Sequence, residues 1–392
     1  MDQREKFVRA AIEGNLVFAE LCRVFDVSRK TGYKWIDRYA ELGPAGLLDQ
    51  GRRPHGNRRS IDEEVARRLL ALRREFPTWG PRKLLAWLEL NEDGWELPAA
   101  STVGDLLKRS GLVKSRRRRR GPPQPHVPAV IAQHPNDLWC TDYKGQFRVG
   151  DGSLCYPFTL SDRVSRFVLR IDSLPSTELE DTRCRMRRAF CTYGLPGAMR
   201  SDNGTPFAGS GAARLSRLGV WLLRLGIRLD LTTPGHPEQN GQHERMHRVL
   251  KAEAPPASSL AAQQRVFDRF RRCYNHERPH EALGQRPPAS VYVPSTRSMP
   301  ATLPELEYPP DWEQRTIHHK GDLKWKSRRY FVTEALDGER VGLEPAGDGL
   351  WRVYFGTLLL GLVHDALPEE AGLIRPERWA RLTPKVSPMS PV

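Results

Sequence analysis

The chain contains no long hydrophobic run. Its most apolar stretch, residues 220–231, is interrupted by Arg224, Arg228 and Asp230, whereas a membrane-spanning helix needs about 18 to 20 mostly apolar residues. The first residues, MDQREK, are charged and do not have the apolar centre of a secretory signal. We therefore expect no contact with a membrane and a cytoplasmic location.

Cysteine is also scarce, with six residues among 392 and no Cys-x-x-Cys pair. This spacing fits neither a disulfide framework nor a zinc ribbon, so buried or spare thiols are expected at all six positions. These are Cys22, Cys140, Cys155, Cys184, Cys191 and Cys273.

Positive charge is abundant by contrast. Lys and Arg number 62 and Asp and Glu 47, which gives a net charge of +15 and a pI near 9.8. The excess lies in residues 1–300, and the remainder is slightly acidic. A field of this sign favours a polyanionic partner, and the length predicts two to three domains, or four if some are small.

Two helical segments open the chain. Residues 1–50 and 60–113 each show short amphipathic helices joined by tight turns, which is typical of helix-turn-helix DNA-binding domains. In the first, Ser28 is a suitable N-cap, and Arg29, Lys30 and Lys34 are available to DNA. The alternative is a helical hairpin with a solvated basic face.

A basic linker, residues 114–135, follows. Its five consecutive arginines precede a Gly-Pro-Pro segment, so it cannot bury a core but can neutralise several phosphates. A solvated tether is the alternative, and the two roles are compatible. The arginines are Arg116, Arg117, Arg118, Arg119 and Arg120.

The pattern then changes to alternating strands and helices over 136–293, which predicts an α/β domain with one mixed sheet. Residues 310–365 alternate as short strands and predict a small antiparallel β-barrel. A Pro- and Ser-containing tail, 383–392, is expected to be disordered.

Three carboxylates fall on different elements of the α/β segment. Asp142 lies in its first predicted strand, Asp202 just after the fourth, and Glu244 on the helix after the fifth. Cleavage of a phosphodiester by two divalent cations requires such hard oxygen ligands, gathered at one end of a sheet.

Four segments carry a family resemblance: the region around Asp142, Ser-Asp-Asn-Gly at Asp202, Pro-Glu-Gln-Asn-Gly-Gln-His-Glu-Arg at Glu244, and 274–284. In this order they resemble the integrase core of DDE transposases of bacterial insertion sequences and of retroviral integrases. The resemblance implies a ribonuclease H-like catalytic core, with Asp142, Asp202 and Glu244 as catalytic residues and metal ligands. It also implies two Mg²⁺ ions per active site, with Mn²⁺ as a substitute. Lys144 and Arg245 are candidate phosphate contacts.

Two alternatives concern the third acid. The usual spacing in this family reaches Glu238, which follows Pro237 in a loop, whereas Glu244 has the family's Gly-Gln-His-Glu-Arg context and is preferred. In addition, His243, Glu244 and His247 match the His-Glu-x-x-His motif of zinc proteases. That five-residue match is short, and the helix is too polar for such an enzyme.

The leading hypothesis is therefore a DNA transposase that binds the terminal inverted repeats of its element. It would cleave to expose 3′-hydroxyl ends and join them to target DNA. The partners expected are double-stranded DNA, both element ends and target, and further copies of the chain in a synaptic complex at the bacterial nucleoid. The alternative is a non-catalytic DNA-binding regulator derived from a transposase. The repeat sequence, target preference, pathway, oligomeric state and need for an accessory ATPase are not readable.

Overall fold

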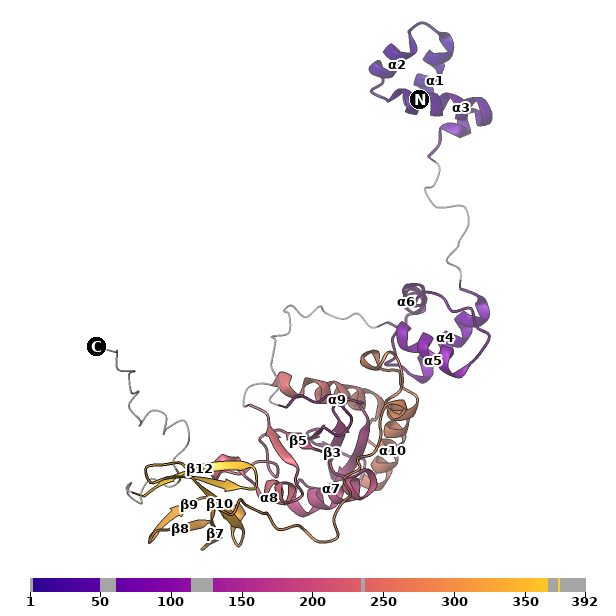
Figure 1. Cartoon of the computed structure of the whole chain (residues 1–392). Coiled ribbons are helices and arrows are strands. Elements are labelled where there is room, and N and C mark those ends of the chain that lie inside the picture. The colour runs from indigo at the N-terminus through magenta and orange to yellow at the C-terminus, as the bar shows by residue number, and fades with distance from the viewer. Residues whose placement is uncertain (1–2, 50–60, 114–129, 234–236, 366–372, 374–392) are drawn as a thin grey trace, which may run out of the picture. The chain divides into compact units, whose positions relative to one another are not determined.

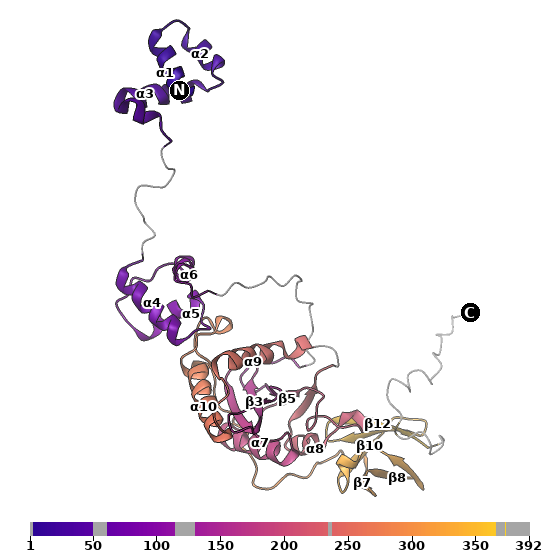
Figure 2. The ribbon, with the colours of Figure 1, turned by 180° about the vertical axis from the view of Figure 1, so that it is seen from behind.

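The computed structural model describes residues 3–49, 61–113, 130–233, 237–365 and 373. The chain divides into two compact units, Met1–Ser60 and Ile61–Val392, which are described separately (Figure 1 and Figure 2). None of the helices in the described ranges is long and apolar enough to cross a membrane. The predicted arginine run at 116–120 and the predicted tail at 383–392 lie outside these ranges.

The first unit is helical, as the sequence predicted. The Ser28 hydroxyl caps the third helix by accepting a hydrogen bond from the backbone N–H of Thr31 at 3.1 Å. Gly32 allows that helix to approach the core, because a Cβ there would lie 2.8 Å from the ring of Phe7. The elements are α1 (Gln3–Glu13), α2 (Phe18–Val24), α3 (Arg29–Leu42) and the 3-10 helix η1 (Gly43–Leu47).

A second helical domain opens the other unit. Its first helix is capped by Asp62, whose carboxylate accepts from the backbone N–H of Glu64 at 2.8 Å. Three helices enclose a core that includes the fully buried Leu69, Trp79 and Leu84. They are α4 (Glu63–Glu75), α5 (Pro81–Asn91) and α6 (Ala100–Arg109).

A mixed sheet follows. Antiparallel pairs join β4 to β3 and β3 to β1, and parallel pairs join β1 to β5 and β5 to β6, so β1 lies in the middle. The short β2 pairs with the start of β3. The strands are β1 (Leu138–Tyr143), β2 (Phe147–Arg148), β3 (Leu154–Asp162), β4 (Val168–Leu174), β5 (Ala198–Ser201) and β6 (Arg228–Leu231).

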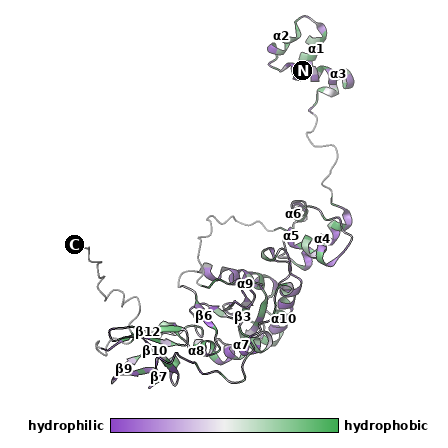
Figure 3. Cartoon of the chain, in the orientation of Figure 1, coloured by the Kyte–Doolittle hydropathy of each residue, from purple (hydrophilic) through white to green (hydrophobic). Residues whose placement is uncertain are grey.

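Helices cover both faces of this sheet (Figure 1). Helices α7 (Leu179–Tyr193) and α8 (Arg217–Arg224) share one buried core with Trp139 of β1. Helices α9 (Gly241–Glu253) and α10 (Leu260–His276) share another, on the opposite face. Figure 3 shows hydrophilic and hydrophobic residues mixed along these helices, as expected where one side of a helix meets a core and the other meets water.

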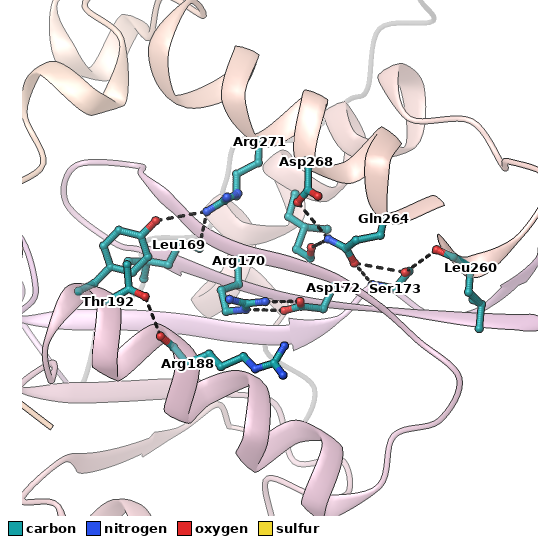
Figure 4. A network of polar contacts seen from close by, with 12 residues as sticks. Leu169, Arg170, Asp172, Ser173, Arg188, Thr192, Leu260, Gln264, Asp268 and Arg271 are labelled. Atoms are coloured by element: carbon teal, nitrogen blue, oxygen red, sulfur yellow. Dashed lines mark hydrogen bonds and ion pairs between the residues drawn. The ribbon is translucent and has the colours of Figure 1, made fainter. Parts of the chain in front are cut away.

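Helix α10 also covers the outer edge of the sheet. Strand β4 pairs only with β3 among the described strands, so the backbone groups on its other side need partners. Asn275 supplies two of them, since its amide donates to the carbonyl of Val168 at 2.9 Å and accepts from the N–H of Val168 at 2.8 Å. Three side chains on one side of α10 bond to backbone groups of β4, namely Gln264, Arg271 and Asn275. Figure 4 shows the bonds of Gln264 and Arg271.

The segment 274–284 continues from this edge to the second helical domain. Buried Arg278 donates through Nη1 to Glu253 Oε1 at 2.8 Å and to the hydroxyl of Thr78 at 3.2 Å. Its guanidinium lies 6.0 Å from the ring centroid of Trp79. This part of the family-like sequence therefore connects the helical domain, α9 and α10.

The last domain is an antiparallel sheet that curls into a half-barrel. Its strand order is β12-β11-β10-β7-β8-β9, and β9 and β12 are not paired with each other in the described part of the chain. The small barrel predicted from the sequence is thus present as an open form. The strands are β7 (Glu313–His318), β8 (Asp322–Trp325), β9 (Arg328–Phe331), β10 (Arg340–Pro345), β11 (Leu350–Phe355) and β12 (Leu358–His364).

Short 3-10 helices connect several of these elements. They are η2 (Ala212–Arg214), η3 (Pro237–Asn240), η4 (Glu281–Leu283), η5 (Pro288–Ser290) and η6 (Glu334–Leu336).

Candidate active site

Two of the predicted carboxylates lie at the same end of the core sheet, the carboxyl end of its parallel strands. Asp142 is near the end of β1, and Asp202 directly follows β5. These strands run parallel with Cys140 beside Arg200, so continuing the register by two residues places Asp142 opposite Asp202. Neighbouring strands are separated by about 4.8 Å, and the two carboxylates are therefore close in space.

The third carboxylate comes from a helix. Glu244 lies in the first turn of α9 and is exposed to solvent. Helix α9 packs against this sheet. The negative charge of Glu244 therefore reaches Asp142 and contributes to raising the pKa of Asp142.

The carboxyl group of Asp142 has a strongly altered pKa. Burial and then the negative charge of Asp202 raise the pKa of Asp142 to about 7, with a smaller contribution from Glu244. A hydrogen bond from the backbone of Tyr143 and the charge of Lys144 oppose this rise. The charged form of Asp142 is therefore held at a cost in free energy that a bound cation would relieve.

The donor set suits a hard divalent cation, since it consists of carboxylate oxygens that repel one another. Among the residues that the structure describes, no group of three or more His, Cys, Asp or Glu side chains is placed to hold a metal ion directly. One oxygen of Asp202 accepts a hydrogen bond from the backbone N–H of Gly204 at 3.1 Å.

The two histidines beside Glu244 are buried rather than open to a metal. His243 and His247 are 2% and 3% exposed, and burial lowers the pKa of His243 to about 3 and that of His247 to about 2. Their Nε2 atoms lie 2.8 and 2.7 Å from the hydroxyl of Thr159. A pair of nitrogens directed at one hydroxyl does not form the zinc site that the His-Glu-x-x-His motif suggested.

A buried ion pair supports the strand before Asp202. Arg200 donates from Nε and Nη2 to one oxygen of Asp230 at 2.9 and 2.6 Å, which links β5 to β6. Its Nη1 donates to the carbonyl of Gln239 at 2.9 Å. Gln239 lies in the 3-10 helix η3, and so does the alternative acid, Glu238. The side chain of Glu238 is outside the described part of the structure.

The predicted DNA contacts occupy several places. Arg29, Lys30 and Lys34 are exposed on α3, Lys144 is half-buried after β1, and Arg245 is exposed on α9.

Sequence reasoning missed one residue beside the carboxylates. Thr159 of β3 lies directly across from Asp142 in the antiparallel pair, and its hydroxyl donates to the carbonyl of Asp142 at 2.8 Å. No local motif marks this threonine, and only the strand register identifies it.

Five family models match the chain in order. Helix-turn-helix domain covers residues 3–55 and Homeodomain-like domain covers 31–107. Two models named Integrase core domain cover 132–237 and 225–288. The model IS481 family transposase, C-terminal domain, covers 313–364. Integrase cores typically depend on divalent metal ions, and helix-turn-helix domains are typical DNA-binding domains.

Two curated relatives come from bacterial insertion elements. The "Insertion element IS407 uncharacterized 31.7 kDa protein" of Burkholderia multivorans is 26% identical over 257 residues, which is 62% of this chain and 87% of that protein. The "Insertion element IS476 uncharacterized 39.2 kDa protein" of Xanthomonas euvesicatoria is 28% identical over 181 residues, which is 45% of this chain and 50% of that protein.

Solved structures of retroviral integrases also match. The HTLV-2 integrase catalytic core domain in complex with magnesium shows 15% identity and a TM-score of 0.34, covering 42% of this chain and 100% of that chain. The simian T-cell lymphotropic virus intasome in complex with the PP2A regulatory subunit B56 gamma shows 17% identity and a TM-score of 0.36, covering 76% and 99%. Together, the family models and the insertion-element relatives support an insertion-sequence transposase with an integrase-like core.

Proposed function

We propose that the chain binds the terminal inverted repeats of its element, cleaves to expose 3′-hydroxyl ends and joins these ends to target DNA. The observation that carries the proposal is the parallel register of β1 and β5, in which Asp142 and Asp202 follow paired residues of neighbouring strands. Burial and the charges of Asp202 and Glu244 also raise the pKa of Asp142. Carboxylates contributed by separate elements to one end of a sheet are the ligands that metal-dependent phosphoryl transfer requires.

Asp142, Asp202 and Glu244 would hold two Mg²⁺ ions, and Mn²⁺ would replace Mg²⁺. When bound, these ions supply stabilisation of the charge on the attacking and leaving oxygens of the phosphodiester. The three side chains would bind the metal ions and would not attack the DNA themselves. One set of carboxylates would therefore serve both cleavage and joining, without a covalent protein intermediate. Lys144 and Arg245, each within two residues of a carboxylate in the sequence, would contact flanking phosphates.

The helical domains would bring the DNA ends to this site. Exposed Arg29, Lys30 and Lys34 begin helix α3 of the first unit, the position from which a recognition helix contacts DNA. Arg116 to Arg120 would track the phosphate backbone of the same end. Joining two ends to one target requires both ends to be held together, so we expect a homo-oligomer acting at the bacterial nucleoid.

The test is nicking of a supercoiled plasmid that carries the DNA flanking this coding sequence, with Mg²⁺ or Mn²⁺. Wild-type protein should cut at the element ends. Asp142→Asn, Asp202→Asn and Glu244→Gln should each lower the rate on the order of a hundredfold or more, the scale seen when a group stabilising transition-state charge is removed. Glu238→Gln is the matched control and should cut normally.

Each other outcome has a definite meaning. Loss of cutting in Glu238→Gln alone would preserve the chemistry but replace the third carboxylate. Wild-type protein that binds the ends in a gel-shift assay yet never cuts would overturn the proposal in favour of a non-catalytic regulator. Unchanged cutting in all three carboxylate variants would place the chemistry elsewhere.

A further inference from the structure

The histidines on either side of Glu244 have no part in the function proposed above, yet both are buried and hydrogen-bonded. His243 and His247 of α9 meet Thr159 and Ser161 of β3 in what we call the Thr159 cluster. All four residues are at most 8% exposed. Because buried polar groups are costly without partners, the arrangement of hydrogens in this cluster is strongly constrained.

The hydroxyl of Thr159 determines that arrangement. A hydroxyl can donate one hydrogen bond and accept two. Thr159 donates to the backbone carbonyl of Asp142 at 2.8 Å, so its oxygen must accept from both imidazoles. His243 and His247 are therefore both protonated at Nε2, at distances of 2.8 and 2.7 Å.

The opposite nitrogens then carry lone pairs. On His243, Nδ1 accepts from the hydroxyl of Ser161 at 2.8 Å. On His247, Nδ1 lies 3.8 Å from a carboxylate oxygen of Asp142. The other neutral tautomer of His247 would place an N–H beside that oxygen and compete with a cation for it.

We propose that Thr159 is a positioning residue for the active site. Its single hydroxyl joins the strand that carries Asp142 to the helix that carries Glu244, and it keeps the carboxylate of Asp142 free of an N–H from His247. The catalytic part of this inference rests on the proposed function, whereas the tautomers and the link between β1 and α9 do not.

The structural part is tested without DNA or metal. In full-length protein labelled with ¹⁵N-histidine, the signals of His243 and His247 would be assigned from the single variants His243→Asn and His247→Asn. At neutral pH both imidazoles should show the Nε2–H pattern, and Thr159→Val should change it. An Nδ1–H pattern for either histidine in the wild type would overturn the inference.

The positioning part is tested by nicking rate against end-binding affinity. Thr159→Val should lower the nicking rate by about 10- to 100-fold, the usual effect of removing a residue that orients a metal ligand. Its affinity for the DNA end should be unchanged. Thr159→Ser restores the hydroxyl and should restore the rate. The matched control is Thr141→Val, since Thr141 is equally buried on neighbouring β1 and its hydroxyl has no hydrogen-bond partner among the described residues.

The variants separate positioning from folding. If Thr159→Val is unstable, Thr159→Ser and Ser161→Ala, which removes one donor to His243, still report on the cluster through the ¹⁵N signals. Wild-type nicking by Thr159→Val, or an equal loss in Thr141→Val, would overturn the positioning role. Should wild-type protein not nick any DNA, the proposed function would fail while the tautomer result still decides the structural part.

Discussion

Asp142 combines burial with nearby negative charge, and this makes it a source of instability in the metal-free protein. Its pKa is raised to about 7 from an ordinary value near 3.8. The folded state therefore binds a proton more tightly than the unfolded state. By linkage, this group's contribution to folding stability is greatest below pH 4 and is lost as pH rises toward 7 and beyond.

Asp142→Asn should accordingly stabilise the metal-free protein at pH 8, on the order of 2 to 4 kcal/mol, because a shift of three pKa units corresponds to about 4 kcal/mol. The difference should shrink at pH 4, where the wild-type carboxyl is protonated. Urea unfolding in EDTA at both pH values measures it. Asp105→Asn, on the exposed side of α6, is the control, and equal stability of Asp142→Asn and wild type at pH 8 would contradict the raised pKa.

The ion pair between Arg200 and Asp230 is another single-residue feature with a large expected effect. Both side chains are almost fully buried, at 3% and 6% exposed. Asp230→Asn should destabilise the protein by about 3 to 5 kcal/mol, since it leaves a buried guanidinium without a counter-charge. The double variant Arg200→Met with Asp230→Leu should be less destabilised than Asp230→Asn in a urea titration, because it leaves no unpaired charge. A larger destabilisation of the double variant would show that the unpaired guanidinium costs little.

Among the elements, the contact between α10 and β4 protects the sheet. An open strand edge is a template for pairing with another chain, and three side chains of α10 occupy the free backbone groups of β4 instead. Their spacing of seven and four residues places them on one side of the helix. Helix α10 therefore satisfies backbone groups of β4 that a further strand would otherwise pair with.

Asn275→Ala should destabilise this edge by on the order of 2 to 4 kcal/mol, because two buried backbone groups of Val168 lose their partner. Hydrogen exchange of β4 amides should accelerate, and the protein should aggregate more readily. Arg272→Ala, at an exposed position of the same helix, should leave both unchanged. Wild-type exchange in the Asn275 variant would mean that water replaces the lost amide at little cost.

In the molecule as a whole, positive charge is concentrated away from the half-barrel. Residues 1–300 carry the full excess of the +15 net charge, and they include both helical domains and the integrase-like core. Affinity for DNA should therefore depend steeply on salt, because each phosphate that the protein neutralises releases counterions.

Replacing Arg29, Lys30 and Lys34 with Ala should reduce the slope of log affinity against log salt by up to about 3, one for each phosphate that the variant no longer neutralises. Fluorescence anisotropy with a labelled element end, from 50 to about 200 mM salt, measures that slope. Lys6→Ala with Arg9→Ala removes exposed charge from α1 and is the control. A triple variant with the wild-type slope would remove α3 from the DNA interface.

Local patterns in the sequence were enough to predict the cap at Ser28, the alternation of strands and helices, and the element on which each carboxylate lies. Helical periodicity, capping and strand alternation depend on residues a few positions apart. Asp142 on a strand, Asp202 at a strand end and Glu244 on a helix all followed from such short patterns. The order of the motifs also predicted the family.

Contacts between distant segments could not be predicted in this way. Thr159 meets His243 and His247 across 84 and 88 positions, so a motif that resembles a zinc site in the sequence is a hydroxyl-bound pair in the fold. The half-barrel likewise differs from a closed barrel only by the missing pairing of β9 with β12 in the described chain. Register and closure depend on the packing of the whole domain, because a strand's partner is selected by the core that both strands share.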